Sequence, residues 1–107
     1  MNRATIRQGE IWWMETPDAK SRPALVLVRN EAIDLLTSIT VAPLTRTIRG
    51  IPSEIALGND DGLQVECVAT FDNVVTVPRS FLTRQIGAVR RARWPEVCLA
   101  MRAAIGC

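Results

Sequence analysis

Short apolar runs separated by turn residues occupy the first three quarters of the chain. Several of these runs are rich in β-branched or aromatic side chains, which favour strands. The strand candidates are residues 10–15, 24–28, 35–41, 53–57, 66–77 and 85–89. Proline and aspartate in residues 16–20, and glycines at both ends of 58–62, predict turns. The pattern therefore predicts a mainly β structure of short strands.

The last segment changes from strand-like to helical spacing. Pro95 suits the first turn of a helix and Gly106 suits its end. The apolar stripe of this predicted helix consists of Trp94, Val97, Cys98, Met101, Ala104 and Ile105. Leu99 falls outside that stripe, so it is either an exposed leucine or a contact with a partner subunit. We expect one C-terminal helix that covers part of a sheet or barrel.

Length and composition set the broad class. The 107 residues are enough for one compact domain, which we expect to span residues 1–107, and 48% hydrophobic residues argue against disorder. No apolar run reaches the roughly 18 residues of a membrane helix. The polar start, Met1 to Glu10, lacks the apolar centre of a secretory signal. We therefore expect a cytoplasmic protein with no membrane partner.

The residues that usually bind metals are scarce. Histidine is absent, and the cysteines are three in number, far apart and without a CxxC pair. Neither a disulfide framework nor a zinc site is expected, and no cofactor is predicted. Cys67 and Cys98 are expected to be buried and Cys107 to be a free thiol at the end of the chain.

The basic residues are unusual in kind rather than in number. Net charge is only +2, but 12 of the 13 basic residues are arginine, whose planar group suits phosphate and nucleobases. A codon bias toward arginine would give the same composition, so the bias permits nucleic-acid binding without establishing it.

Arg22 and Thr45 are the strongest candidates for chemistry. Arg22 opens the apolar run 24–28, and Thr45 closes a run that begins at Ile39. In a shared site, the guanidinium would stabilise the charge of a pentacoordinate phosphorus, and the hydroxyl would donate to a phosphate oxygen. Without an imidazole base, such a site suits RNA, which supplies its own nucleophile. Alternatively, Arg22 pairs with a carboxylate at the edge of the core and Thr45 bonds local backbone.

Further polar residues extend this hypothesis toward a nucleic-acid surface. Lys20, Arg46 and Arg49 would follow a single-stranded backbone, or simply form a solvated basic face. Asp72 and Asn73 interrupt an apolar strand, either as a bulge or turn or as readers of base edges.

Two questions stay open at the level of sequence. Trp12 and Trp13 are adjacent and would face opposite sides of a strand, one in the core and the other at an interface or against a base. Glu10, Glu15 and Asp18 are the carboxylates nearest to Arg22, and nothing in the sequence ranks them as general bases.

Five short blocks in order resemble the MazF/PemK family of bacterial toxins. The blocks are residues 9–13, 22–28, 41–45, 72–77 and 86–87. The resemblance implies an SH3-like β-barrel (MazF/CcdB-like) with a C-terminal helix, usually a homodimer. It also implies an endoribonuclease that cuts single-stranded RNA without a metal, through attack of the 2′-OH, and leaves 2′,3′-cyclic phosphate and 5′-OH ends.

The resemblance also assigns roles to residues. It places the family's catalytic arginine on Arg22 and its catalytic threonine on Thr45, and it implies base reading by Asp72 and Asn73. A cognate antitoxin would lay an acidic, apolar segment over the RNA site.

The chain departs from many relatives in one place, because the loop at residues 16–21 is short. An altered RNA motif is expected as a result. Two alternatives remain at this stage: a CcdB-like toxin that inhibits DNA gyrase through protein contacts, and a binding barrel without activity.

Overall fold

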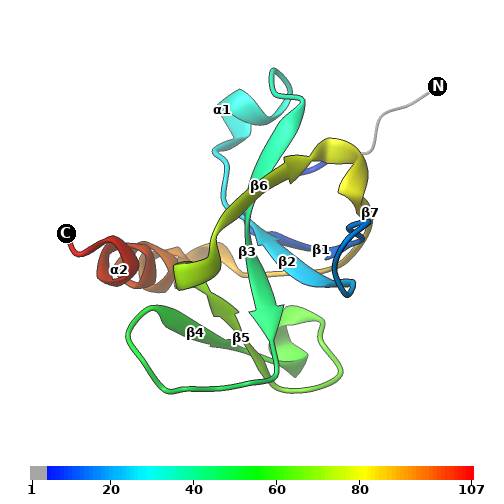
Figure 1. Ribbon diagram of the computed structural model, residues 1–107. Coiled ribbons are helices and arrows are strands. Elements are labelled where there is room, and N and C mark those ends of the chain that lie inside the picture. Colours follow the sequence, from blue (N-terminus) through cyan, green and yellow to red (C-terminus); the bar gives the residue numbers. More distant parts are fainter. Residues whose placement is uncertain (1–4) are drawn as a thin grey trace.

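The computed structural model describes residues 5–107, so the first four residues of the polar start lie outside it. Seven strands form an antiparallel sheet, and a 12-residue helix ends the chain (Figure 1). The strands are β1 (Glu10–Met14), β2 (Arg22–Val26), β3 (Ser38–Thr45), β4 (Glu54–Leu57), β5 (Cys67–Thr70), β6 (Val75–Pro78) and β7 (Leu82–Ala88). The helices are α1 (Asn30–Ile33) and α2 (Trp94–Ile105).

The eight-residue strand β3 organises the sheet. The order of paired strands is β4-β5-β3-β2-β1-β7, and β6 pairs with β3 away from this path. The first half of β3 pairs with β6, whereas Leu44 and Thr45 at its end pair with β5. The predicted mainly β fold with a C-terminal helix is confirmed, although the strand path does not close into a complete barrel.

Buried side chains lie on both faces of the strands. Ile11, Leu25 and Ala42 belong to one core cluster, together with residues of β4, β5 and α2. Trp12 belongs to a second cluster with residues of β2, β3 and β7. Alternation along β1 therefore answers the tryptophan question: Trp12 is 5% exposed and lies in the core, while Trp13 points to the other face.

The predicted strand 66–77 is divided in two. A 3-10 turn, Phe71–Asn73, separates β5 from β6. Ser53 holds this turn: its carbonyl accepts the Phe71 backbone N–H, and its hydroxyl donates to Asp72 Oδ2 at 2.6 Å. After this turn the chain continues as β6, which pairs with the first half of β3, whereas β5 pairs with the end of β3. The single predicted strand is therefore two strands.

The buried stripe of α2 is turned slightly from the predicted one, since it includes Ala100, and Trp94, Met101 and Ala104 pack against the core. Val97 and Ala100 are buried, and the expectation of a buried Cys98 was wrong because that thiol is exposed. The face of α2 that carries Val97 and Ala100 packs toward the 3-10 turn at 71–73 and β4, so Cys98 on the adjoining face lies in solvent. Ile105 is exposed for the same reason, and Leu99 is 63% exposed. Cys67 is buried and Cys107 is exposed, as expected.

Candidate active site

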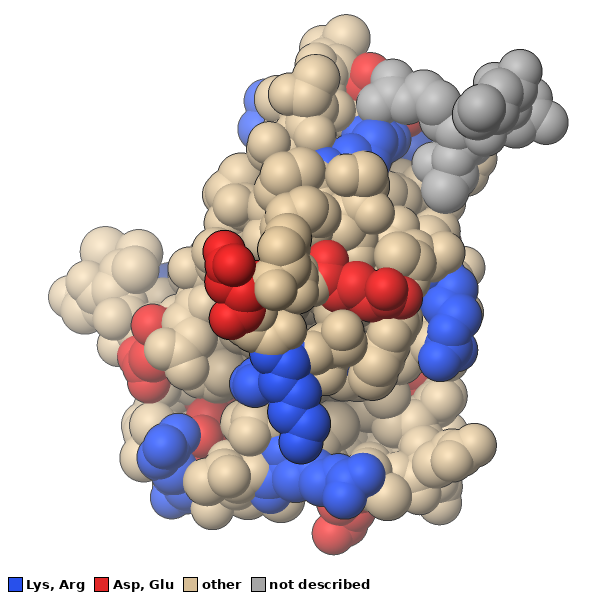
Figure 2. Space-filling model, turned by 45° about the vertical axis from the view of Figure 1, so that its right-hand side comes forward, with Lys and Arg blue, Asp and Glu red and all other residues tan. Residues whose placement is uncertain are grey.

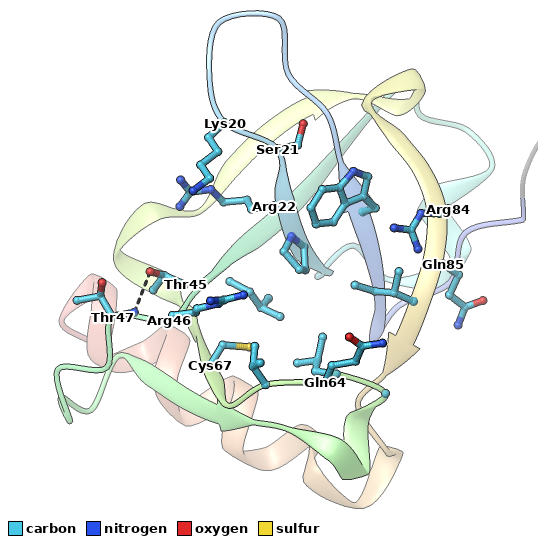
Figure 3. A pocket seen from close by; sticks show the side chains of 17 residues that line it. Lys20, Ser21, Arg22, Thr45, Arg46, Thr47, Gln64, Cys67, Arg84 and Gln85 are labelled. Carbon is cyan, nitrogen blue, oxygen red and sulfur yellow. Dashed lines mark hydrogen bonds between the residues drawn. The ribbon is translucent and has the colours of Figure 1, made fainter.

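A cavity of about 770 Å³ opens at the ends of β1 and β3, the start of β2 and the middle of β7, beside residues 62–67 (Figure 3). It continues one face of the sheet. Ile11 on β1 and Leu25 on β2 are buried core residues, and Trp13 and Pro23, two positions along the same strands, line the cavity. Side chains two positions apart on a strand share a face. The cavity therefore lies on the same face of the sheet as the core cluster that contains Ile11 and Leu25, next to that cluster.

Arg22 and Thr45 both line this cavity, from neighbouring strands. Ala24 on β2 pairs with Pro43 on β3, and the two strands are antiparallel. The start of β2 therefore lies beside the end of β3, which brings Arg22 toward Thr45. Among residues 5–107, no carboxylate lies within ion-pair distance of Arg22, so the alternative of a structural ion pair has no support.

The lining of the cavity is cationic. Lys20, Arg22, Arg46 and Arg84 line it, and none of the described residues in its wall is a carboxylate. We call it the cationic cavity. Figure 2 shows Lys and Arg side chains gathered low on one face of the molecule, with acidic side chains mostly above them. This charge arrangement favours an anionic ligand.

The Thr45 hydroxyl is oriented by the chain that follows it. Its Oγ1 accepts a hydrogen bond from the Thr47 backbone N–H at 3.1 Å, shown dashed in Figure 3. Within the described part of the chain, its own O–H has no acceptor. The local backbone bond expected as the alternative is present, and it uses the oxygen while leaving the proton available to a ligand.

Three of the predicted binding residues lie outside this cavity. The Arg49 side chain is exposed in the loop after β3, where its backbone N–H donates to Glu54 Oε1. Asp72 is bonded to Ser53, and Asn73 is exposed in the same 3-10 turn. Lys20 and Arg46, by contrast, lie in the wall with Arg22 (Figure 3).

The candidate general bases also lie elsewhere. Glu10 accepts hydrogen bonds from Trp12 Nε1 and from the Arg7 backbone, and Glu15 accepts one from Thr83. Asp18 is exposed in the loop after β1. None of the three lines the cationic cavity.

Several lining residues were not singled out from the sequence. They are Ser21, Thr47, Gln64, Arg84 and Gln85. Gln64 follows a recognised turn and Arg84 lies in a polar strand, and neither context differs from that of an ordinary surface residue. Only the register between β1 and β7 brings Arg84 to Trp13.

The Cys67 thiol in the wall of the cavity is not activated. Burial raises its pKa, the nearby Asp61 carboxylate raises it further, and Arg46 acts in the opposite direction. A thiol with a raised pKa stays protonated at neutral pH and is a poor nucleophile. Across residues 5–107, no three His, Cys, Asp or Glu side chains are grouped to hold a metal ion. In the same range, no helix is long and apolar enough to cross a membrane.

The chain is similar to known proteins over nearly its whole length. Residues 7–105 match the family model described as "PemK-like, MazF-like toxin of type II toxin-antitoxin system". "Probable endoribonuclease MazF2" of Mycobacterium tuberculosis is 40% identical over 103 residues, which cover 95% of this chain and 100% of that protein.

Two solved structures are similar in fold. "Mycobacterium tuberculosis toxin MazF-mt6" superposes with a TM-score of 0.85 at 34% identity, covering 91% of this chain and 96% of that one. A structure described as "Endoribonuclease in complex with its cognate antitoxin from Mycobacterial species" gives a TM-score of 0.83 at 24% identity, covering 95% and 96%, and supports the fold alone. The chain belongs to the PemK-like, MazF-like toxin family of type II toxin–antitoxin systems.

Proposed function

We propose that this chain is the toxin of a toxin–antitoxin pair and cleaves single-stranded RNA within the cationic cavity. The observation that carries the proposal is that Arg22 and Thr45 line one cavity, whose described residues include four cations and no carboxylate. Relatives named as endoribonucleases supply the reaction class. The products are a 2′,3′-cyclic phosphate and a 5′-OH end.

The proposed reaction uses few protein groups. The 2′-oxygen of the RNA attacks the adjacent phosphorus, the bond to the 5′-oxygen breaks, and the 2′-OH proton leaves to solvent. The departing 5′-oxygen takes a proton from solvent. Arg22 stabilises the extra negative charge on the phosphorus, and the free Thr45 O–H donates to a non-bridging oxygen. A cationic wall performs the stabilisation that a metal ion supplies in other nucleases.

The remaining assignments follow from this reaction. Lys20 and Arg46 hold the phosphates that flank the cleaved bond. Arg49, Asp72 and Asn73 lie outside the cavity and would contact nucleotides further along the strand. We also propose that residues 1–107 act as one domain in a cytoplasmic homodimer, and that a cognate antitoxin with an acidic segment covers the cationic cavity.

Cleavage of a long RNA in the presence of EDTA tests the proposal. The wild-type protein is expected to cut at short motifs and to leave 2′,3′-cyclic phosphate ends. Arg22→Ala should lower the cleavage rate at least about 100-fold, because a preorganised charge is lost. Arg29→Ala removes the same charge from an exposed site outside the cavity and should cut like the wild type.

Two outcomes would overturn it: no cleavage of any RNA by the wild type, or full activity of Arg22→Ala. A gyrase supercoiling assay separates the CcdB-like alternative, which the family match and the named relatives do not favour. An inhibitor of that kind would block gyrase and would keep doing so after Arg22→Ala.

A further inference from the structure

Trp13 forms a row with residues of the two neighbouring strands. In the sheet register, Trp13 lies opposite Pro23 on β2 and opposite Arg84 on β7. Directly opposite residues share a face, and all three line the cationic cavity. The Arg84 guanidinium carbon lies 5.6 Å from the centroid of the Trp13 ring, within the range of a cation–π contact. The cavity therefore contains a half-buried aromatic surface with a planar cation over it.

Gln64 lines the same cavity from a different segment (Figure 3). Its side chain is exposed, and within residues 5–107 its amide makes no hydrogen bond. Gln85, the other glutamine in the wall, donates from Nε2 to the Gly87 carbonyl. Gln64 thus presents a free NH2 group, with two donors, and a free carbonyl oxygen to the cavity.

The backbone that carries Gln64 is firmly held although its side chain is free. Asp61 is 3% exposed, and its carboxylate accepts hydrogen bonds from the Gly58 N–H and from Arg93. At the next position the chain passes so close to β7 that a Cβ on Gly62 would lie 2.8 Å from the Gly87 Cα. Gln64 is therefore two residues from a fixed crossing, which restricts where its amide reaches.

Phosphate binding does not explain this part of the cavity. The cations near Arg22 serve an anion, but the apolar face of an indole ring does not, and an amide offers a phosphate only its N–H donors while its carbonyl oxygen stays unused. A nucleobase uses both: its flat face stacks on aromatic rings and guanidinium planes, and its edge pairs with an amide. The chemistry of Trp13, Arg84 and Gln64 matches one unpaired base rather than a second phosphate.

We infer that Trp13, Arg84 and Gln64 form a subsite for one nucleobase adjacent to the cleaved phosphate, and that Gln64 selects which base is accepted. The inference rests on the proposed endoribonuclease function and assigns its specificity to this wall of the cavity. The base stacks against the Trp13–Arg84 pair, and the Gln64 amide bonds its edge. The subsite is separate from Asp72 and Asn73, which lie outside the cavity.

Mapping of cleavage sites tests the role of Gln64. The wild type, Gln64→Ala and Gln64→Glu would each cut the same long RNA, and the new 5′-OH ends would be sequenced. Both variants should lose or change the preference at one position of the motif and keep the others. Arg29→Ala is the control and should reproduce the wild-type motif. Identical motifs for the wild type and both Gln64 variants would overturn the inference.

A binding measurement tests the stacking pair without any cleavage. The probe is a set of 2′-deoxy oligonucleotides, which lack the attacking hydroxyl and cannot be cut. Binding should quench the fluorescence of Trp13. Trp13→Leu and Arg84→Ala should each weaken the affinity for the probes about 10-fold or more. Arg29→Ala removes an equal charge outside the cavity and is the control for the charge lost in Arg84→Ala. Thermal unfolding of each variant confirms that it is folded.

Unchanged affinity in both folded variants would overturn the stacking role. If the wild type binds these probes through Trp13 but cuts no RNA, the proposed reaction fails while the base subsite stands. The two proposals therefore fail separately.

Discussion

Arg93 and Asp61 form an ion pair that ties the start of α2 to the segment carrying Gln64. Arg93 Nη1 lies 3.3 Å from Asp61 Oδ1, and the carboxylate is almost fully buried. The second Arg93 amino group donates to the Ala56 carbonyl at 2.8 Å and also bonds Glu96. One side chain therefore joins α2, β4 and the rim of the cationic cavity.

Removing this arginine should destabilise the fold. Among residues 5–107, Arg93→Ala leaves the buried Asp61 carboxylate with only the Gly58 N–H as a hydrogen-bond donor, and we expect a loss of about 2 kcal/mol in the free energy of unfolding. Arg102→Ala, an exposed arginine on the same helix, should change it by less than about 0.5 kcal/mol. Denaturant unfolding measures both, and equal effects would contradict the role given to the ion pair.

The Arg93–Glu96 contact should make stability depend on pH. The hydrogen bond from Arg93 lowers the pKa of Glu96 in the folded protein. The contact therefore stabilises the fold fully at pH values above the pKa of Glu96 in the unfolded chain, about 4.3, and this stabilisation is lost as pH falls through the lower pKa of the folded state. Glu96→Gln should therefore lower the melting temperature slightly at pH 7 and make no difference in strong acid. A gap between the two proteins that widened toward acid would contradict this sign.

Thr45 should matter through its hydroxyl alone. Thr45→Ala removes both the acceptor of the Thr47 N–H and the proposed phosphate donor, and we expect cleavage to slow about 10²–10³-fold. Thr45→Ser keeps the hydroxyl and should retain most activity. Thr83→Ala changes an exposed threonine outside the cavity and is the control. Single-turnover kinetics measure the cleavage rate of each variant. A Thr45→Ser variant as slow as Thr45→Ala would argue against hydrogen-bond donation by the hydroxyl.

The cleavage rate should rise steadily with pH. The chain has no histidine, and no described residue in the cavity wall is a carboxylate, so no protein base with an ordinary acidic or neutral pKa receives the 2′-OH proton. The logarithm of the single-turnover rate is expected to increase by about one per pH unit between roughly pH 5 and 8. A plateau beginning within that range would reveal a protein general base.

The crossing of Gly62 and Gly87 should tolerate no side chain. A Cβ at Gly87 would lie 1.9 Å from the Asp61 carbonyl oxygen, which is backbone and has little room to move. Gly87→Ala should cost about 2 kcal/mol or more through forced backbone shifts. Gly58→Ala is the matched control, since its backbone is extended and no atom lies within 4 Å of the added Cβ. Thermal unfolding compares the two, and similar melting temperatures would contradict the close approach.

Much of the fold followed from local patterns. The short apolar runs rich in β-branched and aromatic residues predicted strands, and β1 and β2 lie within two residues of the predicted 10–15 and 24–28. The division of 66–77 was not predictable, since it depends on Ser53, 19 residues before Asp72 in the chain. The exposure of Cys98 depends on how α2 is rotated about its axis against the sheet, with Ala100 rather than Cys98 buried, and the spacing of apolar residues does not fix that rotation.

Some residues of the candidate site could be predicted from the sequence, and others could not. Arg22 and Thr45 were candidates because each lies at one end of an apolar run that predicts a strand, and because a guanidinium and a hydroxyl together suit a phosphate. Gln64 and Arg84 have no such context, and their placement comes from pairing between β1 and β7 and from the crossing near Gly62. When strand register brings distant residues together, the sequence next to each residue does not predict the contact.

The contact between Gly62 and Gly87 also restricts how this chain can diverge. A Cβ at either glycine would clash with the backbone of the other segment. Neither position can therefore carry a side chain unless the backbone of the other segment moves. Homologues that carry a larger residue at one of these positions should therefore show an altered length or path in the stretch corresponding to 58–66. An alignment would reveal this as correlated change between two positions 25 residues apart, and the lineages affected should recognise different RNA sequences.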